Sequence, residues 1–99
     1  MIKKAYLKTK KLCKVTFALQ KEDDTETIEL LGDFNSWSVG EGLKLKKQKN
    51  NTFKGTLNLE IGKEYEFRYL INGTNWGNDN DADKQVPNPY GSQNSVLSI

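Results

Sequence analysis

The sequence YEFRYLING, residues 65–73, decides the fold of this chain. Every second side chain in its first seven positions is large and apolar, a period typical of a strand that buries one face. These side chains are Tyr65, Phe67, Tyr69 and Ile71. Asn72-Gly73 follows directly, and this pair is a strong signal for a type I′ hairpin turn. The stretch therefore predicts an antiparallel hairpin whose first strand carries Arg68 on its outward face.

The same alternation recurs along the chain, and no stretch of useful length shows the period of an amphipathic helix. Strands are expected at residues 12–19, 27–31, 43–46, 53–60, 65–71 and 95–99. Asn50-Asn51 is a second hairpin signal, just before the strand at 53–60. Six or more short strands at this spacing predict an all-β antiparallel sandwich. Residues 1–10 are expected to form either a loose arm or an edge strand.

Length and composition favour one small domain without catalytic machinery. The 99 residues suit a single domain over residues 1–99, too small for a core plus a buried cofactor. The chain has no histidine, which removes the commonest general base and the commonest zinc ligand. No nucleophile elbow, phosphate-binding glycine loop or dinucleotide fingerprint is present. We therefore expect no enzyme, no cofactor and no metal site.

Charge and cysteine content limit the partners and the compartment. The formal net charge of +2 is too small to argue for a nucleic-acid partner. No apolar run approaches the roughly 20 residues that a membrane span needs. The single Cys13 cannot form an internal disulfide, which fits a reducing compartment. We expect a cytoplasmic protein that binds neither nucleic acid nor membrane.

The run DNDAD at residues 79–83 allows two interpretations. Its alternating carboxylates resemble the start of a calcium-binding loop. The sixth position of such a loop is glycine and the twelfth is glutamate, whereas these positions hold Lys84 and Tyr90 here. A turn in which Asp and Asn side chains bond nearby backbone amides fits the run better.

Two tryptophans lie in turn-like sequence instead of in the strands. Trp37 ends the run GDFNSW at 32–37, and Trp76 ends the run NGTNW at 72–76. Gly, Asn, Asp and Ser crowd both runs, as turns require. A tryptophan in a solvated loop is costly unless its ring is covered from inside or meets a flat apolar partner. The rings are therefore either caps on the sandwich core or a platform for the flat C–H face of a sugar.

Three stretches of the chain carry a resemblance to a known family. They are GDFNSW at 32–37, FKGTLNLEIGKEYEFRYLINGTNW at 53–76 and PYGSQNSVLSI at 89–99. In this order, over roughly residues 12–99, they resemble carbohydrate-binding module family 48. That family includes the early-set domain of isoamylases and glycogen-branching enzymes, and the glycogen-binding domain of the AMP-activated protein kinase beta subunit. The segment from Phe67 to Pro87 is also similar to short bacterial proteins that consist of this domain alone.

The resemblance implies an immunoglobulin-like, early-set β-sandwich with no catalytic activity, and it implies sugar-binding residues. Trp37 and Trp76 match two tryptophans that stack on glucose units of a curved α-1,4-linked chain. Arg68 stands at the place of a lysine that hydrogen-bonds sugar hydroxyls, so the donors are kept but their shape changes. One extra residue between Gly73 and Trp76 departs from the family's pattern and is expected to tilt the second ring.

The remaining implied site residues lie near the C-terminus. Tyr90 stands at the place of a leucine that is threaded by the glucan ring. Ser92 and Asn94 match a threonine and an asparagine that follow this leucine. The implied partner is an α-1,4-glucan such as glycogen, a maltooligosaccharide or a cyclodextrin-like ring. The alternative is a docking domain that binds a glycogen-metabolising enzyme and keeps only a vestigial glucan site.

Overall fold

The stretch at residues 65–73 forms the hairpin that its sequence predicts. Strand β7 spans Glu64–Ile71 and pairs with the short strand β8, Asn75–Gly77. Asn72 and Gly73 have φ angles of 53° and 71°, the left-handed conformation that a type I′ turn requires at both central positions. The Thr74 N–H closes the turn by donating to the Ile71 carbonyl oxygen at 3.2 Å. Because β7 also pairs with β3 and β10, it is a central strand of its sheet.

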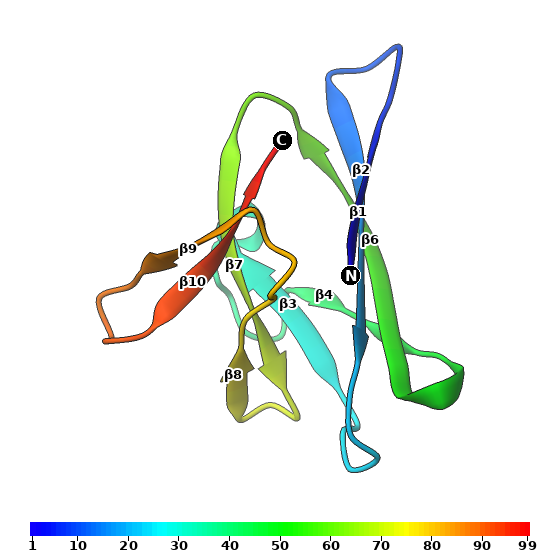
Figure 1. The fold of residues 1–99 in the computed structure, drawn as a ribbon, viewed down its shortest axis with the longest axis vertical. Coiled ribbons are helices and arrows are strands. Elements are labelled where there is room, and N and C mark those ends of the chain that lie inside the picture. Colours follow the sequence, from blue (N-terminus) through cyan, green and yellow to red (C-terminus); the bar gives the residue numbers. More distant parts are fainter.

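The structure, a computed structural model that describes all 99 residues, consists of two antiparallel sheets (Figure 1). One sheet has the strand order β1-β2-β6-β5, and the other has the order β4-β3-β7-β10-β9, with β8 attached to β7. The bounds of the other strands are Ile2–Tyr6 (β1), Leu12–Gln20 (β2), Ile28–Gly32 (β3), Leu43–Lys44 (β4), Lys46–Lys47 (β5), Thr52–Glu60 (β6), Lys84–Pro87 (β9) and Gln93–Ser98 (β10). This arrangement confirms the predicted all-β antiparallel sandwich.

Two 3₁₀ turns are the helical elements of the fold, η1 at Asp33–Asn35 and η2 at Lys49–Asn51. Neither is long and apolar enough to cross a membrane. The η2 turn contains Asn50 and Asn51, both with positive φ, and it connects β5 to β6. The second hairpin signal in the sequence is therefore also confirmed.

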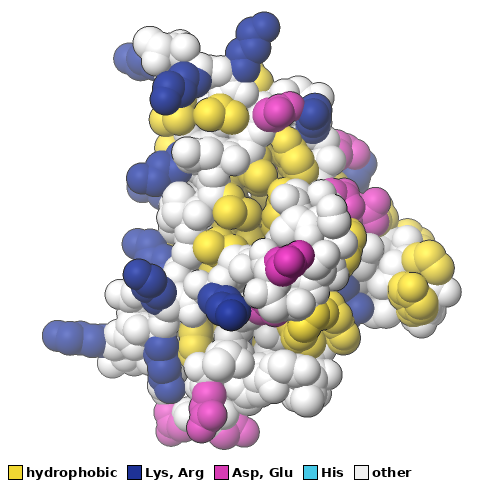
Figure 2. All heavy atoms as spheres, turned by 180° about the vertical axis from the view of Figure 1, so that it is seen from behind, with side chains coloured by type: hydrophobic (Ala, Val, Ile, Leu, Met, Phe, Trp, Pro, Cys, Tyr) yellow, Lys and Arg dark blue, Asp and Glu magenta, His cyan; other side chains and the backbone are white.

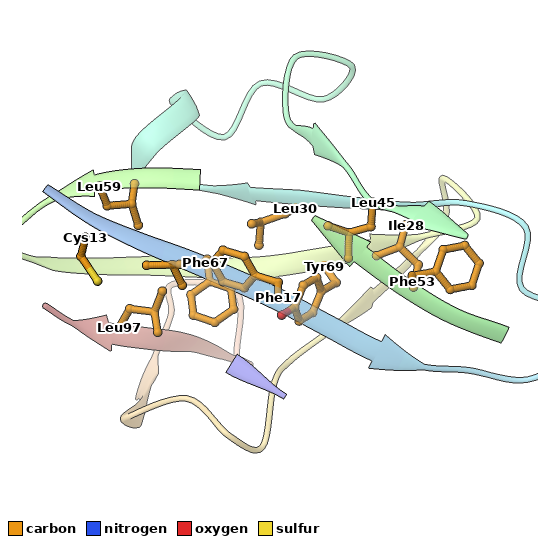
Figure 3. Packing of buried hydrophobic residues seen from close by; sticks show 11 residues of the cluster. Cys13, Phe17, Ile28, Leu30, Leu45, Phe53, Leu59, Phe67, Tyr69 and Leu97 are labelled. Carbon is orange, nitrogen blue, oxygen red and sulfur yellow. The ribbon is translucent and has the colours of Figure 1, made fainter. Parts of the chain in front are cut away.

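The core lies between the two sheets and is built on three aromatic side chains. Phe67 and Tyr69 point inward from β7 and Phe17 from β2, and all three are almost fully buried. Their ring centroids lie 5.7 to 6.5 Å apart in edge-to-face arrangements. Other apolar side chains from both sheets complete the cluster (Figure 3): Cys13, Val15, Ile28, Leu30, Leu45, Phe53, Leu59 and Leu97. Since side chains alternate along a strand, Arg68 lies on the outer face of β7, as predicted.

The alternation at residues 43–46 predicts one strand, and this prediction is wrong. The stretch contains parts of two strands that belong to different sheets. β4 pairs with β3, whereas β5 pairs with β6. Leu45 lies between them, is buried, and donates its N–H to the Ile28 carbonyl oxygen at 2.9 Å. The chain changes sheets at Leu45 because this side chain fills the core between the sheets. Lys44 and Lys46 stay exposed on either side, so the alternation continues through the crossing and does not reveal it.

Residues Ile2–Tyr6 form an edge strand instead of a loose arm. β1 pairs with β2 along its whole length. Lys4 also ties it to the second sheet, because Nζ donates to Asp83 Oδ2 at 2.7 Å and to the Ser98 carbonyl oxygen at 2.9 Å. Partial burial raises the pKa of Asp83, but hydrogen bonds from Lys4 and from the Ser98 N–H outweigh this effect and hold the pKa below its ordinary value.

The run at residues 79–83 folds as a hydrogen-bonded turn. Asp79 is buried, and its Oδ2 accepts the Tyr69 hydroxyl at 2.6 Å while its Oδ1 accepts the Asp81 N–H at 2.9 Å. Asp83 is engaged by Lys4 instead. These carboxylates therefore serve separate partners, and no group of three or more metal-ligating side chains converges in the structure. The turn anchors the chain between β8 and β9, since the Asp79 N–H also donates to Ser95 Oγ at 2.9 Å.

Because the Tyr69 hydroxyl is buried and bonded to Asp79, the fold is expected to lose stability at alkaline pH. Burial of the hydroxyl, reinforced by the Asp79 carboxylate, raises the pKa of Tyr69 far above its ordinary value of about 10. Because the folded-state pKa is raised, the contribution of Tyr69 is fully present below about pH 10 and is lost as the pH rises further. We expect the free energy of unfolding to fall above this pH, with a slope from this one group approaching about 1.4 kcal/mol per pH unit.

Urea unfolding at neutral pH and at steps of increasing alkalinity measures this slope. Tyr69→Phe removes the titrating hydroxyl and should lack this part of the alkaline loss, although the missing hydrogen bond costs about 1–3 kcal/mol at neutral pH. Tyr6→Phe, at an exposed tyrosine of β1, is the matched control and should behave like the wild type. The same alkaline slope in Tyr69→Phe and in the wild type would contradict this assignment.

Charged side chains are unevenly distributed over the face shown in Figure 2. Most of the visible Lys and Arg side chains project along one side, acidic side chains lie at one end and along the opposite side, and an apolar band runs through the middle. Four ion pairs form, and in each of them at least one side chain is substantially exposed. Exposed pairs contribute little to stability. The fold therefore depends on its aromatic core and strand pairing more than on charge.

Candidate functional site

Arg68 and Trp76 stand together on the outer face of the second sheet. The β7–β8 pairing sets Trp76 opposite Leu70, on the same face as Arg68. The Arg68 guanidinium carbon Cζ lies 5.7 Å from the centroid of the Trp76 ring, within the range of a cation–π contact. Trp76 remains 43% exposed. The Trp76 ring therefore lies beside Arg68 despite the extra residue between Gly73 and Trp76.

Trp37 lies in the loop that follows β3, in an uncommon backbone conformation. Asn35 shapes the start of this loop, because its Oδ1 accepts the Gly32 N–H at 2.9 Å and its Nδ2 donates to the Leu30 carbonyl oxygen at 3.0 Å. Ser36 and Trp37 then have φ angles of 56° and 58°. This left-handed region is rare for a bulky side chain, and such residues cluster at binding and active sites.

Asp33 links the Trp37 ring to strand β7. The Trp37 indole Nε1–H donates to Asp33 Oδ1 at 3.1 Å. The other carboxylate oxygen of Asp33, Oδ2, accepts the Glu66 backbone N–H at 2.8 Å. The edge of the indole is thereby fixed relative to the strand that carries Arg68. The sequence marks Asp33 only as a turn residue, so this role emerges from the structure alone.

Tyr90 is presented by the hairpin between β9 and β10. Its side chain is 92% exposed, a high value for an aromatic ring. Asn88 shapes this hairpin, because its side-chain Oδ1 accepts the backbone N–H of Tyr90 at 3.0 Å and that of Ser92 at 3.2 Å. The Asn88 Nδ2 donates to Asn94 Oδ1 at 3.1 Å. Asn94 in turn donates its Nδ2 to Glu66 Oε1 at 3.1 Å.

These elements surround one open hollow of about 560 Å³, here called the tryptophan hollow. It is lined by Trp37, Arg68, Trp76, Asn88, Pro89, Tyr90 and Asn94. Five of the six predicted site residues therefore meet around one space. Ser92 does not line it; this residue is exposed and contributes backbone hydrogen bonds within the hairpin. Asn88 and Pro89 were not predicted as site residues, although Pro89 begins the C-terminal stretch that carries the family resemblance.

Arg68 carries unused hydrogen-bond donors into the tryptophan hollow. It forms no ion pair, and its Nε is buried without a hydrogen-bond partner. An unpaired donor in a buried position is costly, so such a group calls for an explanation. The lining contains no carboxylate, thiol or imidazole that could serve as a general acid, base or nucleophile. The chemistry available to the hollow is stacking on aromatic rings and hydrogen bonding by guanidinium, amide, hydroxyl and indole N–H groups.

A second, smaller hollow of about 280 Å³ lies elsewhere on the second sheet. Its lining combines charged and aliphatic side chains, among them Glu26, Lys44 and Leu70, and has no aromatic ring. It therefore lacks the features that distinguish the tryptophan hollow.

Comparison with known proteins shows the family to which the chain belongs. The family model described as the glycogen recognition site of AMP-activated protein kinase matches residues 15–99. The chain belongs to this family. No curated protein matches the chain. Membership in this glycogen-recognition family makes the chain a module of a carbohydrate-binding, non-catalytic class, and glucan is the kind of molecule that the family recognises.

Proposed function

We propose that this protein is a non-catalytic α-glucan-binding module whose site is the tryptophan hollow. The observation that carries the proposal is that Trp37, Trp76 and Tyr90 line one hollow together with Arg68. The Arg68 guanidinium forms no ion pair, and its Nε has no hydrogen-bond partner. The three aromatic residues come from separate parts of the chain, and the fold brings them to one face. A glucose unit offers both a flat C–H face for the rings and hydroxyls for the guanidinium.

The exposure and conformation of the rings favour binding over a role in the core. Trp76 and Tyr90 leave 43% and 92% of their surface in contact with water, and neither belongs to the core cluster. Large exposed aromatic surface is typical of interaction sites. Trp37 is held in a left-handed conformation that a capping role would not require. We infer that both tryptophans stack on glucose units and that Tyr90 contacts the inner side of a curved chain.

Polar groups in the hollow suit a neutral sugar. Arg68, Asn88 and Asn94 offer donors, and amide and guanidinium groups commonly fix the orientation of a ligand in a largely apolar site. Maltooligosaccharides, glycogen branches and cyclodextrins are the ligands of choice. A shallow, pre-formed site of this size suggests a dissociation constant of roughly 10 μM to 1 mM.

Arg68 variants test the polar half of the site. We expect Arg68→Ala to weaken maltoheptaose binding by about 1 kcal/mol, or roughly fivefold, because hydrogen bonds to sugar hydroxyls are lost. Arg68→Lys should weaken it less, since an ammonium keeps donors at the same place. Affinity should hardly change between low and high salt, because a neutral sugar releases no condensed counterions. Titrations followed by tryptophan fluorescence at two salt concentrations measure all three quantities.

Lys54→Ala is the matched control for these titrations. Lys54 is an exposed cation on the outer face of the other sheet, opposite Lys46 and far from the lining of the hollow. Its removal should leave the affinity unchanged. Wild-type affinity in Arg68→Ala, or a steep salt dependence, would contradict the proposed site geometry.

The alternative function, docking on a glycogen-metabolising enzyme, has its support in the open edge of strand β1. This strand pairs only with β2, so its other edge can accept a further strand. The same fluorescence titration separates the two functions. A docking domain with a vestigial site would leave the emission of Trp37 and Trp76 unchanged by sugar.

A further inference from the structure

Glu66 touches both loops that flank the tryptophan hollow. It lies on β7, two residues before Arg68 and on the same face. Its backbone N–H donates to Asp33, the residue that holds the Trp37 indole. Its side-chain Oε1 accepts the Asn94 amide at 3.1 Å. Glu66 forms no ion pair, so its carboxylate is available for this one connection.

The hydrogen bonds from Glu66 to the Tyr90 hairpin form a directed relay. A carboxylate only accepts, so Asn94 must turn its Nδ2 toward Glu66 and its Oδ1 toward Asn88. Asn88 must then turn its Nδ2 toward Asn94, which leaves its Oδ1 for the hairpin. The backbone N–H groups of Tyr90 and Ser92 only donate, and they need that oxygen. The Glu66 carboxylate at one end can only accept, and the backbone N–H groups at the other end can only donate. Both ends therefore require the same orientation of the Asn94 and Asn88 side-chain amides.

We infer that Glu66 is a positioning residue that fixes the Tyr90 hairpin over the tryptophan hollow through Asn94 and Asn88. This inference rests on the proposed function, because the hairpin matters to binding only if sugar occupies the hollow. Rigid placement of Tyr90 lowers the ordering cost of binding. Asn94 consequently serves the site first by orienting Asn88, and its second amide hydrogen and the second lone pair of its Oδ1 remain for a ligand.

Three substitutions separate this role from general effects on the fold. Glu66→Ala removes the acceptor at the base of the relay, while Glu66→Gln keeps an acceptor oxygen and removes only the charge. Glu64→Ala is the matched control, since Glu64 is a carboxylate on the same face of β7 that binds Lys84 and Ser98 instead. All three substitutions keep the backbone N–H of residue 66, which donates to the Asp33 carboxylate.

Two measurements are made on each variant. Amide hydrogen exchange at Tyr90 and Ser92, without sugar, reports the order of the hairpin directly. We expect exchange to be roughly three- to tenfold faster in Glu66→Ala and unchanged in Glu66→Gln and Glu64→Ala. Maltoheptaose affinity should fall by roughly three- to tenfold in Glu66→Ala alone, within the range that loop ordering contributes to binding.

Two results of the exchange measurement would overturn the inference, and one result of the binding measurement would contradict only the proposed function. Unchanged exchange in Glu66→Ala would overturn the relay. Equally fast exchange in Glu66→Ala and Glu66→Gln would show that charge, not acceptor geometry, holds the hairpin, and would also overturn it. A wild-type protein that binds no sugar but shows the expected exchange pattern would contradict the proposed function while supporting the relay.

Discussion

Replacing Trp37 by alanine should reduce maltoheptaose affinity by about 1–2 kcal/mol or more, roughly five- to thirtyfold, and leave the fold intact. The ring supplies one of the flat surfaces of the tryptophan hollow, and its loop contributes no side chain to the fully buried core. Alanine experiences a similar cost in the left-handed backbone conformation of this position, so the substitution removes the ring without relieving the strain. Calorimetric titration of the variant measures the affinity, and thermal unfolding measures the fold.

Tyr6→Ala is the matched control for Trp37→Ala. Tyr6 is also an aromatic residue with substantial exposure, at 57%, but it lies on β1 and not at the hollow. Its removal should leave affinity unchanged. If Trp37→Ala keeps full affinity and instead loses several degrees of melting temperature, then Trp37 is a packing residue and the proposed site is wrong.

The largest effect on stability is expected at Gly32, the last residue of β3. A β-carbon added there would lie 2.4 Å from the Glu66 carbonyl oxygen and 2.9 Å from the Phe67 β-carbon. Both belong to the neighbouring strand β7 and cannot rotate away, so the two strands must move apart. We expect Gly32→Ala to cost about 3 kcal/mol of unfolding free energy. The melting temperature should fall by roughly 12–24 °C for a domain of this size.

Gly77→Ala is the matched control for this substitution, since Gly77 also lies in a strand beside β7. The added β-carbon there would meet only Ile71 Cδ1 at 3.1 Å, the far end of a flexible side chain. Its cost should stay below about 1 kcal/mol. Equal melting temperatures for Gly32→Ala and the wild type would contradict the close packing of β3 against β7.

Most of the sandwich could be predicted from alternation, because a strand with one buried face leaves a period of two in the sequence. The pattern at Tyr65 to Ile71 correctly placed Phe67 and Tyr69 in the core and Arg68 outside. The hairpin signal at Asn72-Gly73 implied a strand after the turn, but β8 is too short, at three residues, for its bounds to be predicted. Strand β9 was missed because it is only four residues long and buries little. The sheet change at Leu45 was missed because one inward residue serves both sheets, so the period is preserved.

The sequence identified most residues of the candidate site but could not predict the contacts between them. Turn-rich sequence around Trp37 and Trp76 identified the two rings, and the family resemblance identified Arg68, Tyr90 and Asn94. Neither could show that Asp33 fixes the Trp37 indole or that Asn88 shapes the Tyr90 hairpin. These hydrogen bonds are local, but what they position depends on contacts between residues far apart in the chain, such as Asp33 with the Glu66 N–H and Asn94 with the Glu66 carboxylate. The sugar-binding role of these residues stays a prediction until ligand binding is measured.

The central claim is that glucan binds in the tryptophan hollow, and the two tryptophans of the chain provide its most direct test. An ¹⁵N-labelled sample gives one indole N–H resonance for each of Trp37 and Trp76, and maltoheptaose is titrated against them. The account predicts that both resonances and the Tyr90 amide shift together and saturate at a dissociation constant of roughly 10 μM to 1 mM, while the amides of β1 stay in place. No shift of either indole resonance at saturating sugar, or shifts confined to β1, would contradict it.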